Sequence, residues 1–172
     1  MRSLADAERV RVFLRALGRE AEGEISLYLT GGASAVLEGW RSSTIDVDIK
    51  LVPEADRLYR AIPALKESLQ LNVELAAPSD FIPELAGWRE RSPFVLREGR
   101  LSCHHYDFYS QALAKIERGH AQDGGDVSEM IARGLVEKTR LLAFFGELSP
   151  RLYRYPAIDP DSFRRAVEEA VR

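Results

Sequence analysis

Apolar and polar side chains alternate strictly between residues 44 and 51, with Ile45 at the first apolar position and Asp46 and Asp48 at polar ones. A two-residue period is typical of a strand that buries one face. The pattern therefore predicts a strand over 45–51. Ile45 is expected on its buried face, and the two aspartates side by side on the opposite face.

The segment before this strand has a different pattern. Residues 25–30 form a short apolar run, which predicts a buried strand. Gly31-Gly32 ends the run, residues 33–40 are expected to form a short helix, and a polar turn follows at 41–44. The chain over 25–51 is therefore predicted to be a strand, a glycine turn, a helix and a second strand.

Most of the remaining chain has a helical period. Apolar residues recur every three or four positions in segments that predict helices at 4–20, 53–70, 108–118, 123–133, 137–147 and 160–171. Ser3 and Asp6 have capping-box spacing at the start of the first helix. Pro63 lies inside the second helix and is expected to kink or break it.

A few short segments complete the pattern and indicate the fold class. Strands are predicted at 71–76, 94–96 and 101–106, with an irregular loop over 77–92. Strands therefore end near residue 106, and only helices follow. The predicted fold is α+β, with a small mixed sheet and flanking helices over 1–106 and a helical C-terminal region over 107–172 packed on it.

Composition narrows the class of protein. The chain has 172 residues, 45% of them hydrophobic, which suits one globular domain or a domain with a helical appendage. Its 24 basic and 27 acidic residues give a net charge of −3, so nothing global calls for nucleic acid or an anionic membrane. The start of the chain lacks the apolar region of a signal peptide, and no run approaches the roughly 20 apolar residues of a membrane span. We therefore expect a cytoplasmic protein with no membrane partner.

The single cysteine and the three histidines suggest zinc by residue type only. One cysteine excludes a disulfide framework. His104 and His105 are adjacent on a predicted strand and should point to opposite faces, and the spacing of Cys103 and His120 to them matches no common zinc pattern. We expect no zinc site from these residues.

Two carboxylates on one strand face are a candidate metal site. Asp46 and Asp48 are two residues apart, which places their Cα atoms roughly 6.5–7 Å apart in a strand. Carboxylate oxygens suit Mg²⁺, and pairs of such ions hold the attacking and leaving oxygens of a phosphoryl displacement. The plainer alternative is the solvent face of an ordinary amphipathic strand.

The glycine turn is a candidate phosphate site. Gly31 and Gly32 lack Cβ atoms, so a phosphate can approach their backbone, and the amides at the start of the next helix, with the Ser34 hydroxyl, offer an anion site. A turn without a ligand and a capping serine are the simpler interpretations. Arg41 precedes the aspartate strand, where it either contacts the substrate or only belongs to the turn. Adjacent elements thus supply both catalytic carboxylates and groups that donate hydrogen bonds to a phosphate.

These residues carry a resemblance to a known superfamily. Gly-Gly-Ala-Ser at 31–34, eleven further residues, and Asp-Val-Asp at 46–48 resemble the signature of the DNA polymerase beta-type nucleotidyltransferases. The likeness is to small bacterial nucleotidyltransferase-like proteins, which include toxin components of abortive-infection and toxin–antitoxin systems. A looser likeness extends over most of the chain.

The resemblance implies roles for particular residues. The glycine motif would bind nucleotide phosphate, Asp46 and Asp48 would bind Mg²⁺, and Glu74 matches the third carboxylate that assists the nucleophile. Related toxin-like members use a basic and an acidic residue on later helices. The matching residues here are Lys115 and Asp126, with Arg118 and Asp123 nearby; a solvated helix face and a helix cap are the alternatives for these four.

Three functions follow from these observations. The first is a Mg²⁺-dependent enzyme that transfers a nucleoside monophosphate from a nucleoside triphosphate to an acceptor. The second is a non-catalytic protein of the same fold that binds a toxin or antitoxin partner, and the third is an acidic-faced structural domain. The sequence identifies neither the base nor the acceptor, for which tRNA or other RNA, protein and small molecules all stay open.

Overall fold

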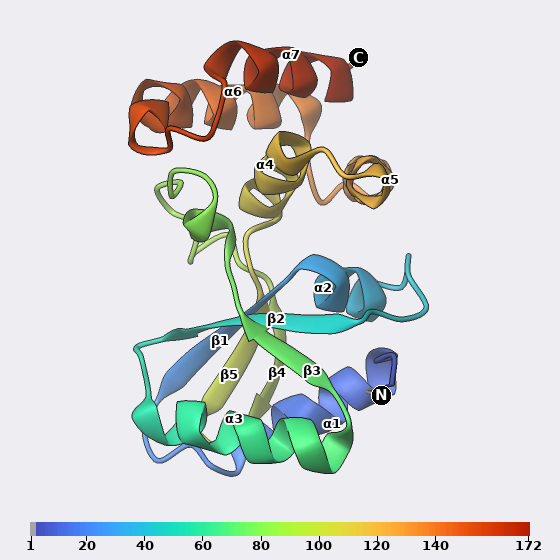
Figure 1. The fold of residues 1–172 in the computed structure, drawn as a ribbon, viewed down its shortest axis with the longest axis vertical. Coiled ribbons are helices and arrows are strands. Elements are labelled where there is room, and N and C mark those ends of the chain that lie inside the picture. Colours follow the sequence, from blue (N-terminus) through green and yellow to red (C-terminus); the bar gives the residue numbers. More distant parts are fainter. Residues whose placement is uncertain (1–2) are drawn as a thin grey trace. The chain divides into compact units, whose positions relative to one another are not determined.

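The computed structural model describes residues 3–172, which form two compact units (Figure 1). The first unit contains the chain up to Ala77 together with Ser92–Tyr106, and the second contains Pro78–Arg91 and Asp107–Arg172. The segment 78–91 thus belongs to the helical unit, although its position in the sequence suggested the first. Hydrogen bonds from the helical unit hold this segment: the Tyr155 hydroxyl donates to the Ser79 carbonyl, and the Arg151 guanidinium donates to the Glu84 carbonyl.

A five-stranded mixed sheet forms the first unit, which makes the fold α+β. In sheet order the strands are β3 (Asn72–Leu75), β2 (Asp46–Val52), β1 (Ile25–Thr30), β5 (Leu101–His105) and β4 (Phe94–Glu98) (Figure 1). The central strand β1 is antiparallel to β2 and parallel to β5. The edge strand β3 runs parallel to β2, and β4 runs antiparallel to β5.

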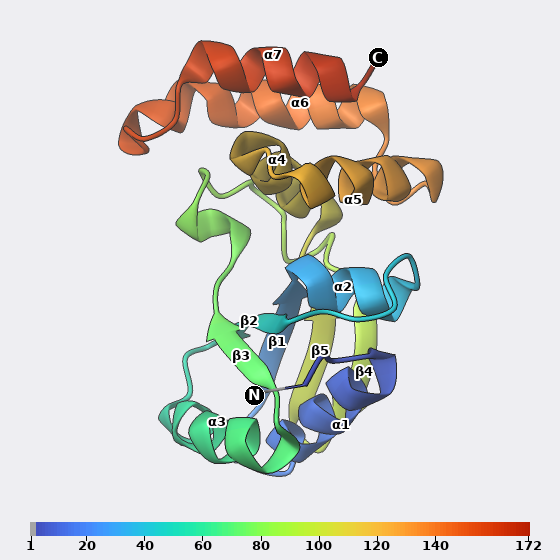
Figure 2. The same cartoon turned by 45° about the vertical axis from the view of Figure 1, so that its right-hand side comes forward.

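Three helices accompany this sheet: α1 (Ala7–Gly18), α2 (Gly31–Glu38) and α3 (Asp56–Leu69) (Figure 2). Alternate residues of β1 and β2, among them Leu27 and Ile49, form one hydrophobic core with Phe13 of α1 and Leu58 of α3. The apolar stripes of α1 and α3 therefore bury one face of the sheet. The other face carries the polar positions of β2, including both aspartates.

The second unit is helical. It contains α4 (Phe108–Arg118), α5 (Ala121–Ala132), α6 (Lys138–Leu148) and α7 (Pro160–Ala170), with 3₁₀ turns η1 (Pro78–Asp80) and η2 (Ser149–Arg154). Asp159 caps α7 by accepting a hydrogen bond from the Asp161 amide, and Pro160 occupies the first helical position, as its sequence predicts. Phe145 and Phe163 pack ring to edge at 5.0 Å between centroids and join α6 to α7.

Four local predictions need correction. The cap of α1 is Asp6, which accepts a hydrogen bond from the Arg9 amide at 2.9 Å, and not Ser3. Pro63 lies within the continuous helix α3, which excludes the predicted break, whereas the alternative of a kink stays a prediction. Ile45 is 69% exposed, because Thr44 still pairs with Ala5 in a separate bridge and β2 begins only at Asp46.

The fourth correction concerns α5, which starts at Ala121, two residues before the expected position.

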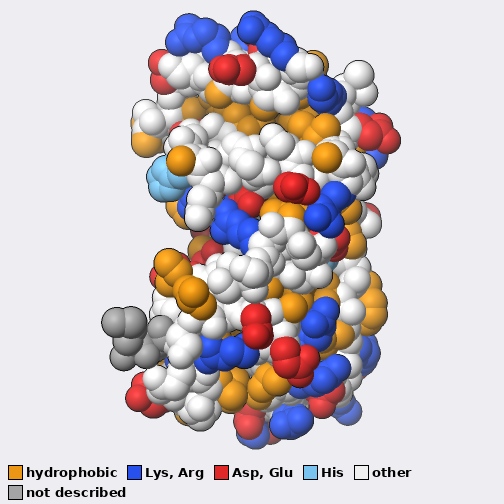
Figure 3. All heavy atoms as spheres, turned by 90° about the vertical axis from the view of Figure 1, so that its right-hand side faces the viewer, with side chains coloured by type: hydrophobic (Ala, Val, Ile, Leu, Met, Phe, Trp, Pro, Cys, Tyr) orange, Lys and Arg blue, Asp and Glu red, His pale blue; other side chains and the backbone are white. Residues whose placement is uncertain are grey.

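On the face shown in Figure 3, acidic and basic side chains are interspersed, as the near balance of the two types implies. None of the helices among residues 3–172 combines the length and the apolar character that crossing a membrane requires.

Candidate active site

Three carboxylates lie on one face of the sheet, at the β2–β3 pair. In the parallel register of these strands Asp48 is opposite Glu74 and Asp46 is opposite Asn72. Side chains at paired positions project to the same face, and neighbouring strands are about 4.8 Å apart. Glu74 is therefore a direct neighbour of Asp48, so the third carboxylate lies beside the aspartate pair.

Asn72 connects two of these carboxylates. Its side-chain amide donates hydrogen bonds to Asp46 Oδ1 and, at 3.3 Å, to Glu74 Oε1. The donor nitrogen screens two like charges that would otherwise repel each other. Sequence reasoning did not select Asn72, although strand alternation from Glu74 would have put it on the same face.

The start of α2 lies against the same carboxylates. Gly31 is the first residue of α2 and has φ +63°, a conformation that favours glycine. A Cβ at this position would lie 2.8 Å from Asp48 Oδ2, so only glycine lets the helix begin this close to the carboxylate. The two glycines are thus the first turn of the helix, where a separate turn was expected. Their amides carry the positive end of the helix dipole.

Gly32 and Arg41 complete this end of the helix. A Cβ on Gly32 would overlap the Thr44 side chain, and the Arg41 Nη1 atom is 3.5 Å from the same point. Arg41 therefore lies in the turn before β2 and next to the first turn of α2. A guanidinium group here adds a cation close to the helix N-terminus.

Ser34 faces the interior, which corrects its predicted role in phosphate binding. Its side chain is fully buried, with Oγ 3.0 Å from His105 Nδ1 and 3.2 Å from the Leu29 carbonyl oxygen. The other ring nitrogen of His105, Nε2, is 3.0 Å from Glu38 Oε1. Ser34 and Glu38 thus join α2 to β5 through one histidine.

His105 is neutral in this arrangement. Burial lowers the pKa of its ring to about 4, and the neighbouring His104 acts in the same direction. The Glu38 carboxylate favours a protonated ring, but its side chain is 30% exposed and burial of the ring outweighs it. A neutral ring that donates from Nε2 to Glu38 leaves Nδ1 as a hydrogen-bond acceptor, so the Ser34 hydroxyl shares its one hydrogen between Nδ1 and the Leu29 carbonyl oxygen.

The free energy of unfolding should therefore decrease as the pH falls from the pKa of an unfolded histidine towards the lower pKa of the folded His105 ring. An unfolded histidine titrates near 6.5 and the folded ring at about 4, so between these values the unfolded chain binds a proton that the folded chain does not. Between pH 7 and pH 5 we expect the native protein to lose about 2 kcal/mol more stability than the His105→Asn variant. Urea denaturation at both pH values measures this difference.

The exposed residue His120 provides the control. His120→Asn should retain the pH dependence of the unsubstituted protein, because this side chain is on the surface. Equal losses of stability for the unsubstituted protein and His105→Asn would contradict the buried neutral ring.

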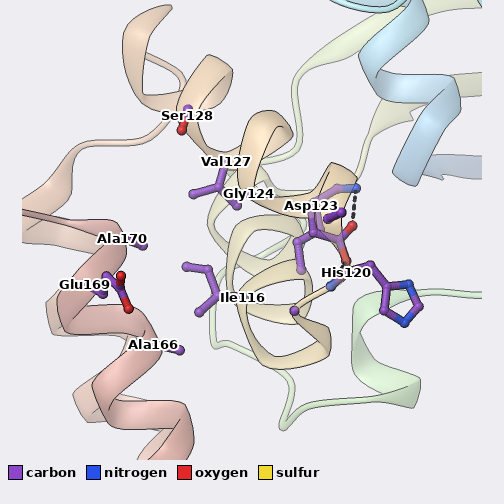
Figure 4. A pocket seen from close by; sticks show the side chains of 12 residues that line it. Ile116, His120, Asp123, Gly124, Val127, Ser128, Ala166, Glu169 and Ala170 are labelled. Atoms are coloured by element: carbon purple, nitrogen blue, oxygen red, sulfur yellow. Dashed lines mark hydrogen bonds and ion pairs between the residues drawn. The ribbon is translucent and has the colours of Figure 1, made fainter.

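The remaining four predicted residues gather in the helical unit. Lys115 Nζ, on α4, is 2.8 Å from Asp126 Oδ2 and 3.4 Å from Asp123 Oδ1, and all three side chains are almost fully buried. Arg118 donates two hydrogen bonds to the Asp123 carboxylate, at 2.7 and 2.9 Å. Asp123 also accepts from the His120 amide at 3.1 Å and so caps α5 (Figure 4).

These ion pairs define the electrostatics of the cluster. Burial raises the pKa of Asp123, but the Arg118 hydrogen bond and the charges of Lys115 and Arg118 lower it by more, so the net pKa is below the usual value. Asp123 is the capping carboxylate, whereas Asp126, for which capping was the alternative, lies inside the helix. The cluster borders an open pocket of about 380 Å³ between α4, α5 and α7, with Ile116, Val127 and Ala166 among its lining (Figure 4).

The carboxylates of the sheet suit Mg²⁺ by their chemistry. Asp46, Asp48 and Glu74 offer only hard oxygen donors, and Gly31 leaves space against Asp48 where a side chain would stand. Among residues 3–172, no three or more His, Cys, Asp and Glu side chains converge as a ready metal site. Asn72 lies between two of these carboxylates, because its amide donates to one oxygen each of Asp46 and Glu74.

Comparison of the chain with models of protein families, with curated proteins and with solved structures gave no match. Any function therefore has to be argued from the residues themselves. Within the first unit, three carboxylates, an asparagine, the first turn of α2 and Arg41 meet at one end of β2.

Proposed function

We propose that this protein is a Mg²⁺-dependent nucleotidyltransferase, which transfers a nucleoside monophosphate from a nucleoside triphosphate to an acceptor hydroxyl. The observation that carries the proposal is the register of β2 and β3. It sets Glu74 beside Asp48, with the glycine start of α2 against the same aspartate. One compact unit thus supplies metal ligands, a candidate base and backbone amides that can donate hydrogen bonds to phosphate.

Each residue of this group has a chemical role in the proposal. Asp46 and Asp48 hold the metal, which when bound would neutralise charge on the phosphate oxygens. The amides of Gly31 and Gly32 donate to the triphosphate, and the Arg41 guanidinium balances its charge. Ser34 has no part, because its hydroxyl is used in the interior.

Glu74 acts as the general base. It takes the proton from the acceptor hydroxyl as that oxygen forms a bond to the α-phosphorus. The bond from the α-phosphorus to the bridging oxygen breaks, and pyrophosphate leaves with the electron pair. Asn72 positions Glu74 through its amide hydrogen bond, which leaves the second carboxylate oxygen for the proton.

Lys115 and Arg118 receive a structural role in this proposal. Their charges are neutralised within the helical unit by Asp123 and Asp126, which occupy the hydrogen-bonding groups that a phosphate would need. This differs from the role that the family resemblance implies for them.

A second candidate is a non-catalytic protein of the same fold that binds a toxin or antitoxin partner. The Asn72 bridge favours it, because the amide occupies one carboxylate oxygen each of Asp46 and Glu74, the groups that the enzyme would use for the metal and the proton. A stable complex with the product of an adjacent gene, formed equally well without nucleotide or Mg²⁺, would support this function.

The decisive experiment incubates the protein with each labelled nucleoside triphosphate, Mg²⁺ and cell extract. We expect one class of macromolecule or small molecule to become labelled, and no label with EDTA. Thermal unfolding with each nucleotide and Mg²⁺ complements this test. Neither labelling nor a shift in melting temperature with any nucleotide would reject the enzyme and leave a structural domain.

A further inference from the structure

Three aromatic rings form a row across the central and outer strands of the sheet. Tyr28 on β1 is in register with His104 on β5, and His104 is in register with Phe94 on the edge strand β4. The Tyr28 and His104 rings stack at 5.4 Å between centroids with an interplanar angle of 25°. The Phe94 ring meets His104 edge to face at 5.7 Å. We call these three residues the aromatic row.

The aromatic row is on the same sheet face as the carboxylates. Tyr28 is opposite Lys50 in the β1–β2 register, and Lys50 follows Asp48 by two residues on the polar side of β2. A path along this face therefore leads from Asp48 through Lys50 to Tyr28, His104 and Phe94. The order of strands β2, β1, β5 and β4 can be followed in Figure 1.

Lys50 adds a cation between the two groups. Within residues 3–172 its amine makes no hydrogen bond or ion pair, and its side chain is partly exposed. It is the only basic residue on this part of β2. A phosphate that follows the sheet face away from Asp48 would meet it first.

His104 presents a neutral ring with one nitrogen available to a ligand. Burial lowers the pKa of His104, and its Nδ1 donates to the Ser92 carbonyl at 3.3 Å. Nε2 is then an acceptor that has no protein partner among residues 3–172. Phe94 is 62% exposed, whereas Tyr28 is buried and supports the ring above it. A flat ligand would therefore contact Phe94 and His104, with Nε2 accepting from an amino group on its edge.

We propose that the aromatic row binds a base near the 3′ end of a single-stranded nucleic acid, which is the acceptor of the transfer reaction. The proposal rests on the proposed function. Bases stack on aromatic side chains whatever the nucleotide sequence, and sheet surfaces bind single strands in this way. The small net charge is compatible with a contact of a few nucleotides only.

The length of the path favours the acceptor over the donor nucleotide. Phe94 is three strands away from β2, which is about 14 Å across the sheet. The base of a nucleotide whose α-phosphate is at Asp48 does not extend that far. The base at Phe94 therefore belongs to another nucleotide, further along a strand whose terminal hydroxyl is at the carboxylates.

Binding of a short fluorescent single-stranded RNA, measured by anisotropy in EDTA so that no transfer occurs, tests this directly. Phe94→Ala should weaken binding about tenfold, as expected for loss of one stacking contact. Phe94→Trp should bind as tightly as the unsubstituted protein or more tightly. Phe81→Ala is the matched control, because Phe81 is 55% exposed in the helical unit and should leave binding unchanged.

Three results would contradict RNA binding at the aromatic row. The first is that the unsubstituted protein does not bind RNA, and the second is that Phe81→Ala and Phe94→Ala weaken RNA binding equally. The third is that Phe94→Ala loses ATP binding while it retains RNA binding. Because the RNA assay needs no catalysis, its failure is separate from failure of the enzyme. Asp48-dependent labelling of a protein acceptor without RNA binding would reject only the proposed role of the aromatic row. Phe94-dependent RNA binding without any labelling would reject only the proposed transferase activity.

Discussion

Replacing Asp48 by asparagine should reduce nucleotide transfer by at least about 100- to 1,000-fold, the loss typical when one preorganised charge-stabilising group is removed. Asp48 is adjacent to Glu74 across the strand pair and lies against Gly31 at the start of α2. Asparagine keeps the shape of the side chain and removes the charge that a Mg²⁺ ion needs. The measurement is the initial rate of label transfer from the preferred nucleoside triphosphate, with and without Mg²⁺.

Folding and activity separate in this experiment. Asp48 is partly exposed and adjacent to Glu74, a like charge, so Asp48→Asn should melt at a temperature no lower than that of the unsubstituted protein. Asp56→Asn is the control, since Asp56 is an exposed aspartate on α3 of the same unit, and it should transfer label at the normal rate. Transfer by Asp48→Asn at the normal rate would remove the carboxylates from the mechanism.

The aspartate pair could be predicted because it depends on a local rule: strict alternation over β2 puts Asp46 and Asp48 on one face. The place of Glu74 beside Asp48 depends on the parallel register of β2 with β3, which pairs residues 26 positions apart and which the alternation within either strand does not give. The sequence predicts that a phosphate approaches the backbone of Gly31, and in the structure the Asp48 carboxylate of the same chain lies against this first residue of α2.

The interior partners could not be predicted, because they depend on contacts between distant segments. Ser34 meets His105, 71 residues later, only when α2 packs beside β5. Helix α2 consists mainly of small and apolar residues, so its pattern does not say which side faces the core. The role of Asn72 depends on the same kind of contact, because its amide bridges Asp46 and Glu74 only when β2 and β3 are paired.

The cluster in the helical unit illustrates the limit of a motif. A functional role for Lys115 and Asp126 is predicted from a resemblance in spacing alone, and the structure pairs the two side chains at 2.8 Å. A pair that is 11 residues apart requires the turn between α4 and α5 to bring the two helices together. Spacing indicates the pair and leaves open whether it binds substrate or stabilises the fold, which a stability measurement decides.

Removing the Asp126 carboxylate should destabilise the protein by about 3 kcal/mol, because it leaves the buried Lys115 ammonium group with Asp123 alone, at 3.4 Å and shared with Arg118. Urea denaturation of Asp126→Ala measures this loss. Glu129→Ala on the same helix is the control. Its ion pair with Arg133 is surface-exposed, so its loss should cost well under about 1 kcal/mol.

The double variant Lys115→Met, Asp126→Ala tests the origin of that loss. Methionine fills the space of the lysine stem without a charge, so it should recover part of the stability lost in Asp126→Ala. Equal costs for Asp126→Ala and Glu129→Ala would contradict a buried, structurally coupled charge. If instead the double variant is stable yet transfers no label, Lys115 contacts the substrate, and its ion pair with Asp126 positions the ammonium group for that contact.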